Sequence, residues 1–139
     1  MDTIGLKLAQ KLVAAALDKA VSDYARPICV SICDAYGFQL SFARGDDAPV
    51  RSIAISQGKA YSSARIGVNT DIWLARLAET NFQASHFCDP QLTALPGGAV
   101  IKAADGKVLG GVGISGLAPH EDQAIANAIA ELAAKEATH

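Results

Sequence analysis

A few charged side chains stand where they could bind an anion or move a proton. Lys59 is flanked by glycine, alanine and serine, so its ammonium could reach into a cleft and hold a carboxylate. Arg65 follows six residues later as a second candidate ligand-binding cation. His120 and Asp122 could shuttle protons, which makes Lys59, His120 and Asp122 the candidate catalytic residues. The alternatives are a solvated lysine and an aspartate that only complements a helix dipole.

Histidine and cysteine spacing predicts no multi-residue metal site. His86 and His120 have no partner at a metal-ligand spacing such as HxxxH. A single histidine could still hold a haem iron from one axial side, so both are candidate metal ligands, and a hydrogen-bonded histidine is the alternative for each. Cys29 and Cys33 lie about 13 Å apart if their segment is a strand, too far for a disulfide. With Cys88, we expect three reduced thiols, mostly buried.

Two glycine-rich segments could let a ligand approach the backbone. Residues 111–116 match the letters GxGxxG, but a dinucleotide site needs a further parallel strand with an acid about 20 residues on, and too little chain remains for it. The turn could still hold a carboxylate at the start of the next helix, so Ser115 and Gly116 are candidate ligand-binding residues. Gly97 and Gly98 could form a pocket wall. The alternative for residues 111–116 is close packing against another backbone, and the alternative for Gly97 and Gly98 is a tight turn that enters the strand.

The elements that must position these residues follow from hydrophobic periodicity and turn residues. Both predicted strand pairs are hairpins, and one of them turns at Asp105-Gly106. The order α-β-β-α-α-β-β-α therefore predicts an α+β fold with a central antiparallel sheet flanked by helices. In chain order, we predict a helix over residues 4–24, strands over 28–33 and 38–44, helices over 50–68 and 70–79, strands over 99–101 and 107–115, and a last helix from Pro119.

Composition predicts one domain over residues 1–139 and excludes several classes of protein. Hydrophobic residues make up 50% and charged residues 19%, which excludes a disordered chain. A net charge of −2 without a basic cluster argues against nucleic acid as the partner. No apolar run reaches about 18 residues, and the first residues lack the pattern of a secretory signal. We therefore expect a cytoplasmic protein that uses neither a membrane nor nucleic acid.

Several motifs, in order, resemble the GlcG/HbpS/PduO C-terminal-domain family. The resemblance covers nearly the whole chain, from VSICDAYGF through LPGGAV to GGVGISGLAPHED. It implies a profilin-like fold, a homo-oligomer from tetramer to octamer, and haem as the cofactor or otherwise none. The matching residues are Asp34, Gly37, Lys59, Ala60, Gly97, Gly98, Gly106, Gly110, Gly113, Ser115, Gly116 and Asp122.

Three functions remain open at this stage. The first is a binding domain for a small molecule, haem or another flat anionic cofactor, in a pocket near or between subunits, with an accessory role in a catabolic pathway. The second is a small cofactor-independent enzyme that acts on an organic acid or an aromatic breakdown product. The third is an oligomeric accessory protein without a small ligand. Whether the protein is an enzyme is left open.

Overall fold

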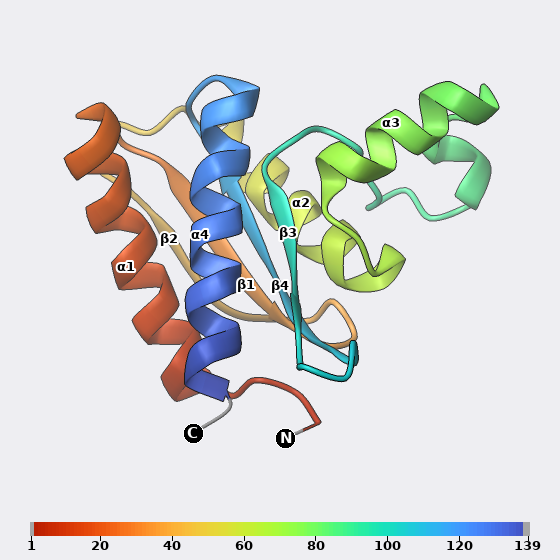
Figure 1. Ribbon diagram of the computed structural model, residues 1–139. Coiled ribbons are helices and arrows are strands. Elements are labelled where there is room, and N and C mark those ends of the chain that lie inside the picture. Colours follow the sequence, from red (N-terminus) through yellow and green to blue (C-terminus); the bar gives the residue numbers. More distant parts are fainter. Residues whose placement is uncertain (1, 138–139) are drawn as a thin grey trace.

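A four-stranded antiparallel sheet forms the centre of the computed structural model, which describes residues 2–137. Residues 1, 138 and 139, the ends of the predicted domain, lie outside the described part. The strand order is β2-β1-β4-β3, so β4 of the second hairpin pairs with β1 of the first (Figure 1). The strands are β1 (Cys29–Asp34), β2 (Gln39–Arg44), β3 (Gly98–Lys102) and β4 (Val108–Ser115).

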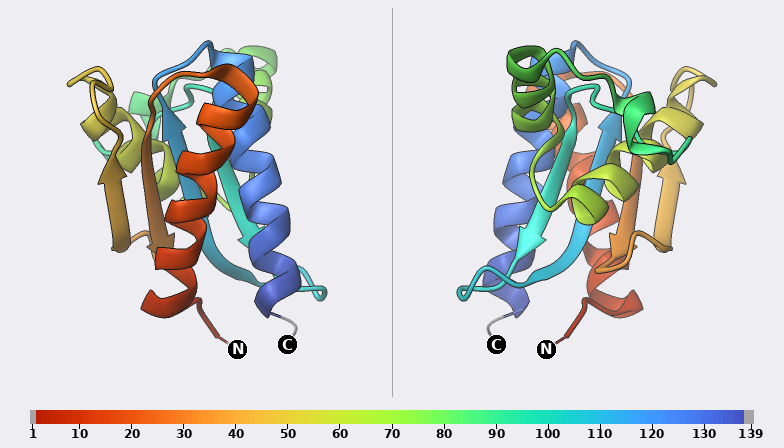
Figure 2. Two further views of the ribbon diagram at one scale, coloured as in Figure 1. Left: turned by 90° about the vertical axis from the view of Figure 1, so that its left-hand side faces the viewer. Right: turned by 90° about the vertical axis from the view of Figure 1, so that its right-hand side faces the viewer.

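Helices cover both faces of this sheet. Helices α1 (Leu6–Tyr24) and α4 (Pro119–Ala137) lie side by side on one face, and α2 (Ser52–Ile66) packs on the other (Figures 1 and 2). Helix α3 (Thr70–Thr80) projects away from the sheet and is followed by the short 3-10 helix η1 (Ala84–Phe87). The predicted element order and the α+β, profilin-like fold are confirmed. Within residues 2–137, no helix is both long and apolar enough to cross a membrane.

The first strand has two chemically different faces. Val30 and Ile32 belong to the main core, which lies between the sheet and the helices α1 and α4. The alternate residues turn to the α2 face, where the Cys33 thiol donates to the Ala60 carbonyl oxygen at 3.3 Å. Ser31 is buried on the same face. The side chains under α2 are therefore small, whereas those under α1 and α4 are branched and apolar.

Glycines in β4 let α2 lie directly on the strand backbone. A Cβ atom added at Gly113 would lie 1.9 Å from the Ser56 carbonyl oxygen, and one added at Gly111 would lie 2.4 Å from that of Ala60. No side chain fits such distances, so these glycines serve helix packing. Helix α2 rests on β4 and β1 in this way and barely reaches β2.

Candidate ligand-binding cleft

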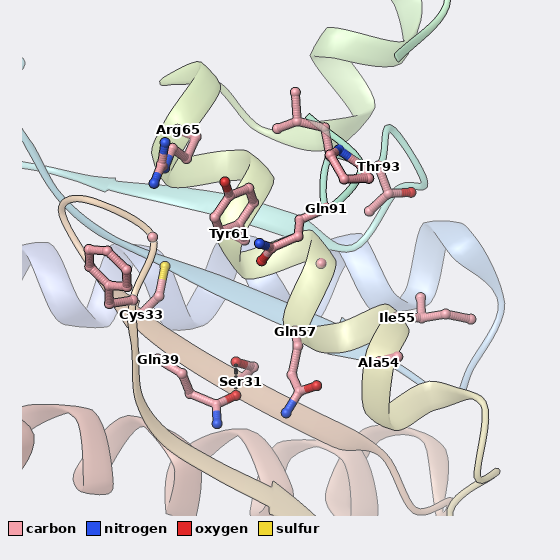
Figure 3. Close-up of a pocket in the computed structure, with 15 residues that line it drawn as sticks. Ser31, Cys33, Gln39, Ala54, Ile55, Gln57, Tyr61, Arg65, Gln91 and Thr93 are labelled. Atoms are coloured by element: carbon pink, nitrogen blue, oxygen red, sulfur yellow. Dashed lines mark hydrogen bonds between the residues drawn. The ribbon is translucent and has the colours of Figure 1, made fainter. Parts of the chain in front are cut away.

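A cleft of about 730 Å³ opens beside α2, toward the outer strand β2 (Figure 3). The cleft exists because α2 packs on β4 and β1 but barely reaches β2, so the α2-side face of β2 is left uncovered. The volume lies within the roughly 300–1,000 Å³ typical of small-molecule sites. Its lining comes from β1, the β1–β2 turn, the first residue of β2, α2 and the loop before β3: Ser31, Cys33, Gly37, Phe38, Gln39, Ala54, Ile55, Gln57, Gly58, Tyr61, Arg65, Pro90, Gln91, Leu92 and Thr93.

Two aromatic rings and one guanidinium give the cleft its chemistry. Phe38 is 63% exposed on the β1–β2 turn, although a phenylalanine ring gains free energy by being covered. The Arg65 guanidinium carbon lies 4.9 Å from the centre of the Tyr61 ring, a cation–π distance. Its Nε donates to the Tyr36 carbonyl oxygen at 2.8 Å. These contacts fix a cation beside an aromatic face at the cleft (Figure 3).

The outer wall of the cleft is the loop over residues 89–93, which is bonded to α2 at two points. The Tyr61 hydroxyl donates to Asp89 Oδ2 at 2.5 Å, and the Thr93 amide donates to Ser62 Oγ at 2.8 Å. The bond to Asp89 raises the pKa of Tyr61, and the same bond lowers the pKa of Asp89. The outer wall of the cleft is thus held to α2 through the side chains of Tyr61 and Ser62.

Neutral polar groups lie on the floor of the cleft. Ser31 Oγ donates to Gln39 Oε1 at 2.9 Å, and the Gln57 side chain lies nearby on α2 (Figure 3). Burial raises the pKa of Cys33 to about 12, so its sulfur stays a thiol. The floor can thus offer hydrogen bonds to a ligand but no negative charge.

Lys59 and Asp122, two of the predicted catalytic residues, face each other in the interior. Lys59 Nζ lies 3.3 Å from Asp122 Oδ2 and donates to the Ile114 carbonyl oxygen at 2.8 Å. Each side chain is 4% exposed. Lys59 comes from α2 and Asp122 from α4, on opposite faces of the sheet, so the pair connects the two helix layers past the end of β4.

Burial shifts both members of this pair toward their neutral forms. Loss of hydration lowers the pKa of Lys59 and raises the pKa of Asp122, while their mutual attraction opposes both shifts. Every buried side-chain nitrogen and oxygen within residues 2–137 has a hydrogen-bond partner. Lys59 was expected to reach into an open cleft, and this geometry does not match, because its ammonium is already paired inside the protein.

The paired glycines at the start of β3, Gly97 and Gly98, are packed in the same part of the interior. Gly97 N donates to Gln123 Oε1 at 2.6 Å, and Gly98 N donates to Thr70 Oγ1 at 2.8 Å. A Cβ atom on Gly97, whose φ is +127°, would lie 2.6 Å from Lys59 Nζ. Both residues are buried, and Gly97 turns the chain into β3, which begins at Gly98, so neither lines the cleft.

The predicted carboxylate-binding turn at Ser115 and Gly116 binds the protein's own acids. Leu117 N donates to Asp122 Oδ1 and Ala118 N donates to Glu121 Oε1, each at 3.1 Å. Ser115 is buried, and its hydroxyl donates to Ser52 Oγ at 3.0 Å. The amide groups expected to receive a ligand carboxylate thus already have acceptors.

His86 and His120 are both on the surface. His86 is exposed in η1, and its Nδ1 accepts the Gln83 amide at 3.0 Å. His120 is the second residue of α4 and is also exposed. Neither lines the cleft. Within residues 2–137, no three histidine, cysteine or acidic side chains gather closely enough to hold a metal ion.

Of the predicted site residues, only Arg65 lines the cleft. Sequence reasoning missed Phe38, Tyr61 and the loop that carries Asp89. One signal was available in the sequence. Phe38 directly follows a turn glycine, and an apolar side chain in a surface turn is expected to be exposed, which can indicate a binding site. Nothing local indicates the Tyr61–Asp89 bond, because its partners are 28 residues apart.

Comparison with known proteins points to one family. The model of a family described as haem-degrading, HbpS-like proteins matches residues 4–131. An uncharacterised 15.0 kDa protein from the dhaT–dhaS intergenic region of Citrobacter freundii is 32% identical over 125 residues, which are 89% of this chain and 87% of that protein.

Solved structures give the same result. A double mutant of HbpS from Streptomyces reticuli superposes with a TM-score of 0.84 at 27% identity, over 95% of this chain and 88% of that one. Protein ORFY of Klebsiella pneumoniae gives 0.82 at 26% identity, over 96% and 92% of the two chains. A complex of PduOC with haem gives 0.80 at 25% identity, over 94% of each chain.

Proposed function

The chain belongs to the HbpS-like family, and from that membership we propose that it binds a flat, carboxylate-bearing tetrapyrrole of the haem class in the cleft beside α2. One relative of the same fold was solved as a haem complex. The observation that carries the proposal for this chain is the cleft itself, in which Arg65 stands against the Tyr61 ring.

The walls of the cleft suit a flat, mostly apolar ring. Phe38 and Tyr61 come from opposite elements, the β1–β2 turn and α2. Aromatic faces bind other π-systems by offset or edge contacts. The aliphatic side chains of Ile55 and Leu92 extend the apolar lining. A polar metabolite without a ring would leave this surface unused.

Arg65 is the cation available for the ligand's carboxylates. Lys59 is held inside the protein by Asp122 and Ile114. The guanidinium of Arg65 is already oriented through its Nε bond to Tyr36, and a guanidinium can pair with a carboxylate through two parallel hydrogen bonds. The neutral amides of Gln57 and Gln91 add donors without a competing negative charge.

The iron of haem finds no strong protein ligand among the described residues of this cleft. Their side chains include no histidine or methionine, and the Cys33 sulfur remains a thiol. The ring and carboxylates of haem therefore fit the residues present, whereas its iron does not. The proposal is accordingly confined to binding.

Titration of the purified chain with haemin, followed by Soret absorbance, tests the proposal. A charge-assisted hydrogen bond contributes about 1.5–3 kcal/mol, so Arg65→Gln is expected to weaken binding roughly tenfold to a hundredfold. Gln57→Glu is also expected to weaken it, because the new carboxylate would repel those of the ligand.

Two matched variants control for unspecific adsorption of haemin. Arg26→Gln removes an exposed arginine that follows α1, and Gln10→Glu adds the same charge on the exposed side of α1. Both positions are outside the cleft and should leave the affinity unchanged. Equal losses in the cleft and control variants would refute binding at this cleft.

Self-association is the second part of the proposal. Five large apolar side chains are 44–56% exposed along α3, η1 and the segment before β3, and contact with a second copy of the chain would remove them from water. A homo-oligomer from tetramer to octamer would cover them. An accessory role in a catabolic pathway stays a prediction. The five side chains are Ile72, Leu74, Phe82, Phe87 and Leu95.

A further inference from the structure

The side chains around the cleft divide into those that suit a ring or a carboxylate and those that could bind a metal. The first group contains Phe38, Tyr61 and Arg65. The second contains, among the described lining residues, only Cys33 and Tyr61 of the usual axial ligands of haem, which are histidine, cysteine, methionine and tyrosine. The Cys33 thiol or the Tyr61 phenol would have to lose its proton to bind the ligand's metal, so the protonation of these two side chains decides whether the metal takes part in binding.

Cys33 cannot easily present a thiolate. Its side chain is 1% exposed, and Sγ donates to the Ala60 carbonyl oxygen at 3.3 Å. A metal would have to displace this bond and take the proton from a group whose burial raises its pKa to about 12. The thiol therefore forms part of the floor and not a metal ligand.

Tyr61 also keeps its proton. Its hydroxyl donates to Asp89 Oδ2 at 2.5 Å, a charge-assisted bond that also fixes the outer wall. A phenolate at this position would face the Asp89 carboxylate and repel it. Iron binding through Tyr61 would thus break the contact that holds the loop to α2. The ring of Tyr61 is 9% exposed and lies under the Arg65 guanidinium, so it lines the wall of the cleft.

From this arrangement we infer that the cleft recognises the tetrapyrrole ring and its carboxylates without a side-chain bond to the central metal, so that it binds metal-free porphyrins as well as haem. The inference rests on the proposed function and narrows it to a class of ligand. The protein's contribution is shape, stacking on the exposed ring of Phe38, and charge pairing with Arg65.

Parallel titrations with haemin and with metal-free protoporphyrin IX test this inference. Haemin is followed by its Soret band and protoporphyrin IX by its fluorescence. The two dissociation constants should agree within about threefold. Arg65→Gln should raise both by the same factor, because it contacts a group that the two ligands share.

The spectrum of bound haemin gives an independent readout. Without a protein ligand on the iron, added imidazole should convert bound haemin to a low-spin spectrum as readily as it converts free haemin. A double variant, His86→Ala with His120→Ala, should leave the spectrum and the affinity unchanged.

Three outcomes would overturn the inference. Haemin binding more than roughly tenfold tighter than protoporphyrin IX, or loss of the haemin spectrum in the double histidine variant, would contradict it and leave the proposed function intact. Failure of both porphyrins to bind would overturn the proposed function and this inference together.

Discussion

At the scale of single residues, the protein keeps its reactive groups protonated or paired. Cys33 donates to a carbonyl, Tyr61 donates to Asp89, and Lys59 is paired with Asp122. None of these groups is poised as a free nucleophile or base at the cleft. Cys33 and Tyr61 therefore act at this cleft as hydrogen-bond donors to the protein itself.

Thiol reactivity offers a direct check of this description. Cys29 and Cys33 are buried, and burial raises the pKa of each, whereas Cys88 is exposed. Because the thiolate is the reacting species, a maleimide near neutral pH should label only Cys88 in the folded protein and all three thiols after unfolding. Mass spectrometry counts the labels, and Cys88→Ser should abolish labelling of the folded chain. Rapid labelling of Cys33 would contradict the geometry of the cleft floor.

The Tyr61–Asp89 bond predicts an alkaline titration. The pKa of Tyr61 lies above its usual value of 10.0 because the phenol donates to Asp89. A raised pKa means that the bond stabilises the fold fully below the unfolded value, and that this contribution is lost as pH rises through the folded one. Asp89→Asn should bring the pKa of Tyr61 back down.

Ultraviolet absorbance against pH measures this titration, and subtracting the curve of Tyr61→Phe isolates Tyr61 from the other two tyrosines. For Asp89 the sign is reversed: its lowered pKa means that its contribution is present above the unfolded value and is lost as pH falls through the folded one. If Asp89→Asn leaves the Tyr61 curve unmoved, the bond does not hold the wall.

At the scale of elements, Lys59 and Asp122 connect α2 to α4 past the end of the sheet. Removing one partner of a buried ion pair leaves an uncompensated charge and costs about 3–5 kcal/mol. Lys59→Met should therefore lower the free energy of unfolding by this amount, measured by urea denaturation. Adding Asp122→Asn should recover part of the loss, since the remaining charge is removed while the acceptor for Leu117 N is kept.

An exposed pair provides the control for that cycle. Lys11 pairs with Glu136 on the surface, with side chains 57% and 37% exposed, so Lys11→Met should change stability by about 1 kcal/mol or less. The single variant Asp122→Asn completes the cycle. If the loss of unfolding free energy in the double variant equals the sum of the losses in the two single variants, the two side chains do not stabilise each other.

The elements themselves were predictable from the sequence because their signals are local. Helical spacing, the Asp105-Gly106 turn and the proline that opens α4 give the observed order. The strand predicted over residues 28–33 is buried along its length, and its alternation of large and small side chains distinguishes the two faces of β1. The glycines at 111 and 113 were recognised as unusual, yet only the contact with α2 explains them.

The site was less predictable because it depends on contacts between distant residues. Lys59 has small neighbours, which indicate close packing and access to a cleft equally well. Its pairing with Asp122 spans 63 residues, and no local pattern encodes such a contact. Arg65 was identified as a cation by type, but its position at the cleft comes from where α2 crosses the sheet.

At the scale of the whole molecule, the segment from α3 to the start of β3 contributes no side chain to the main hydrophobic core. Helix α3 projects from the sheet (Figure 1), and Trp73 packs edge-on against Phe87 with ring centres 5.3 Å apart. The exposed apolar side chains of this segment would be covered in an oligomer. Sedimentation should then give a mass several times the 14.4 kDa of one chain. Leu74→Glu with Phe82→Glu should reduce that mass, and Leu6→Glu, at an equally exposed apolar position on α1, should not. A wild-type mass of one chain would refute assembly.

Assembly and ligand binding should also be coupled, because they share one segment. The wall of the cleft over residues 89–93 lies between Phe87 and Leu95, two of the exposed apolar residues. A neighbouring subunit that covers them would restrain the wall and lower the entropy cost of ordering it around a ligand. The dissociated variant with Leu74→Glu and Phe82→Glu should therefore bind haemin more weakly than Leu6→Glu does, although no residue of the cleft has changed. Equal affinities would mean that one chain completes the cleft alone.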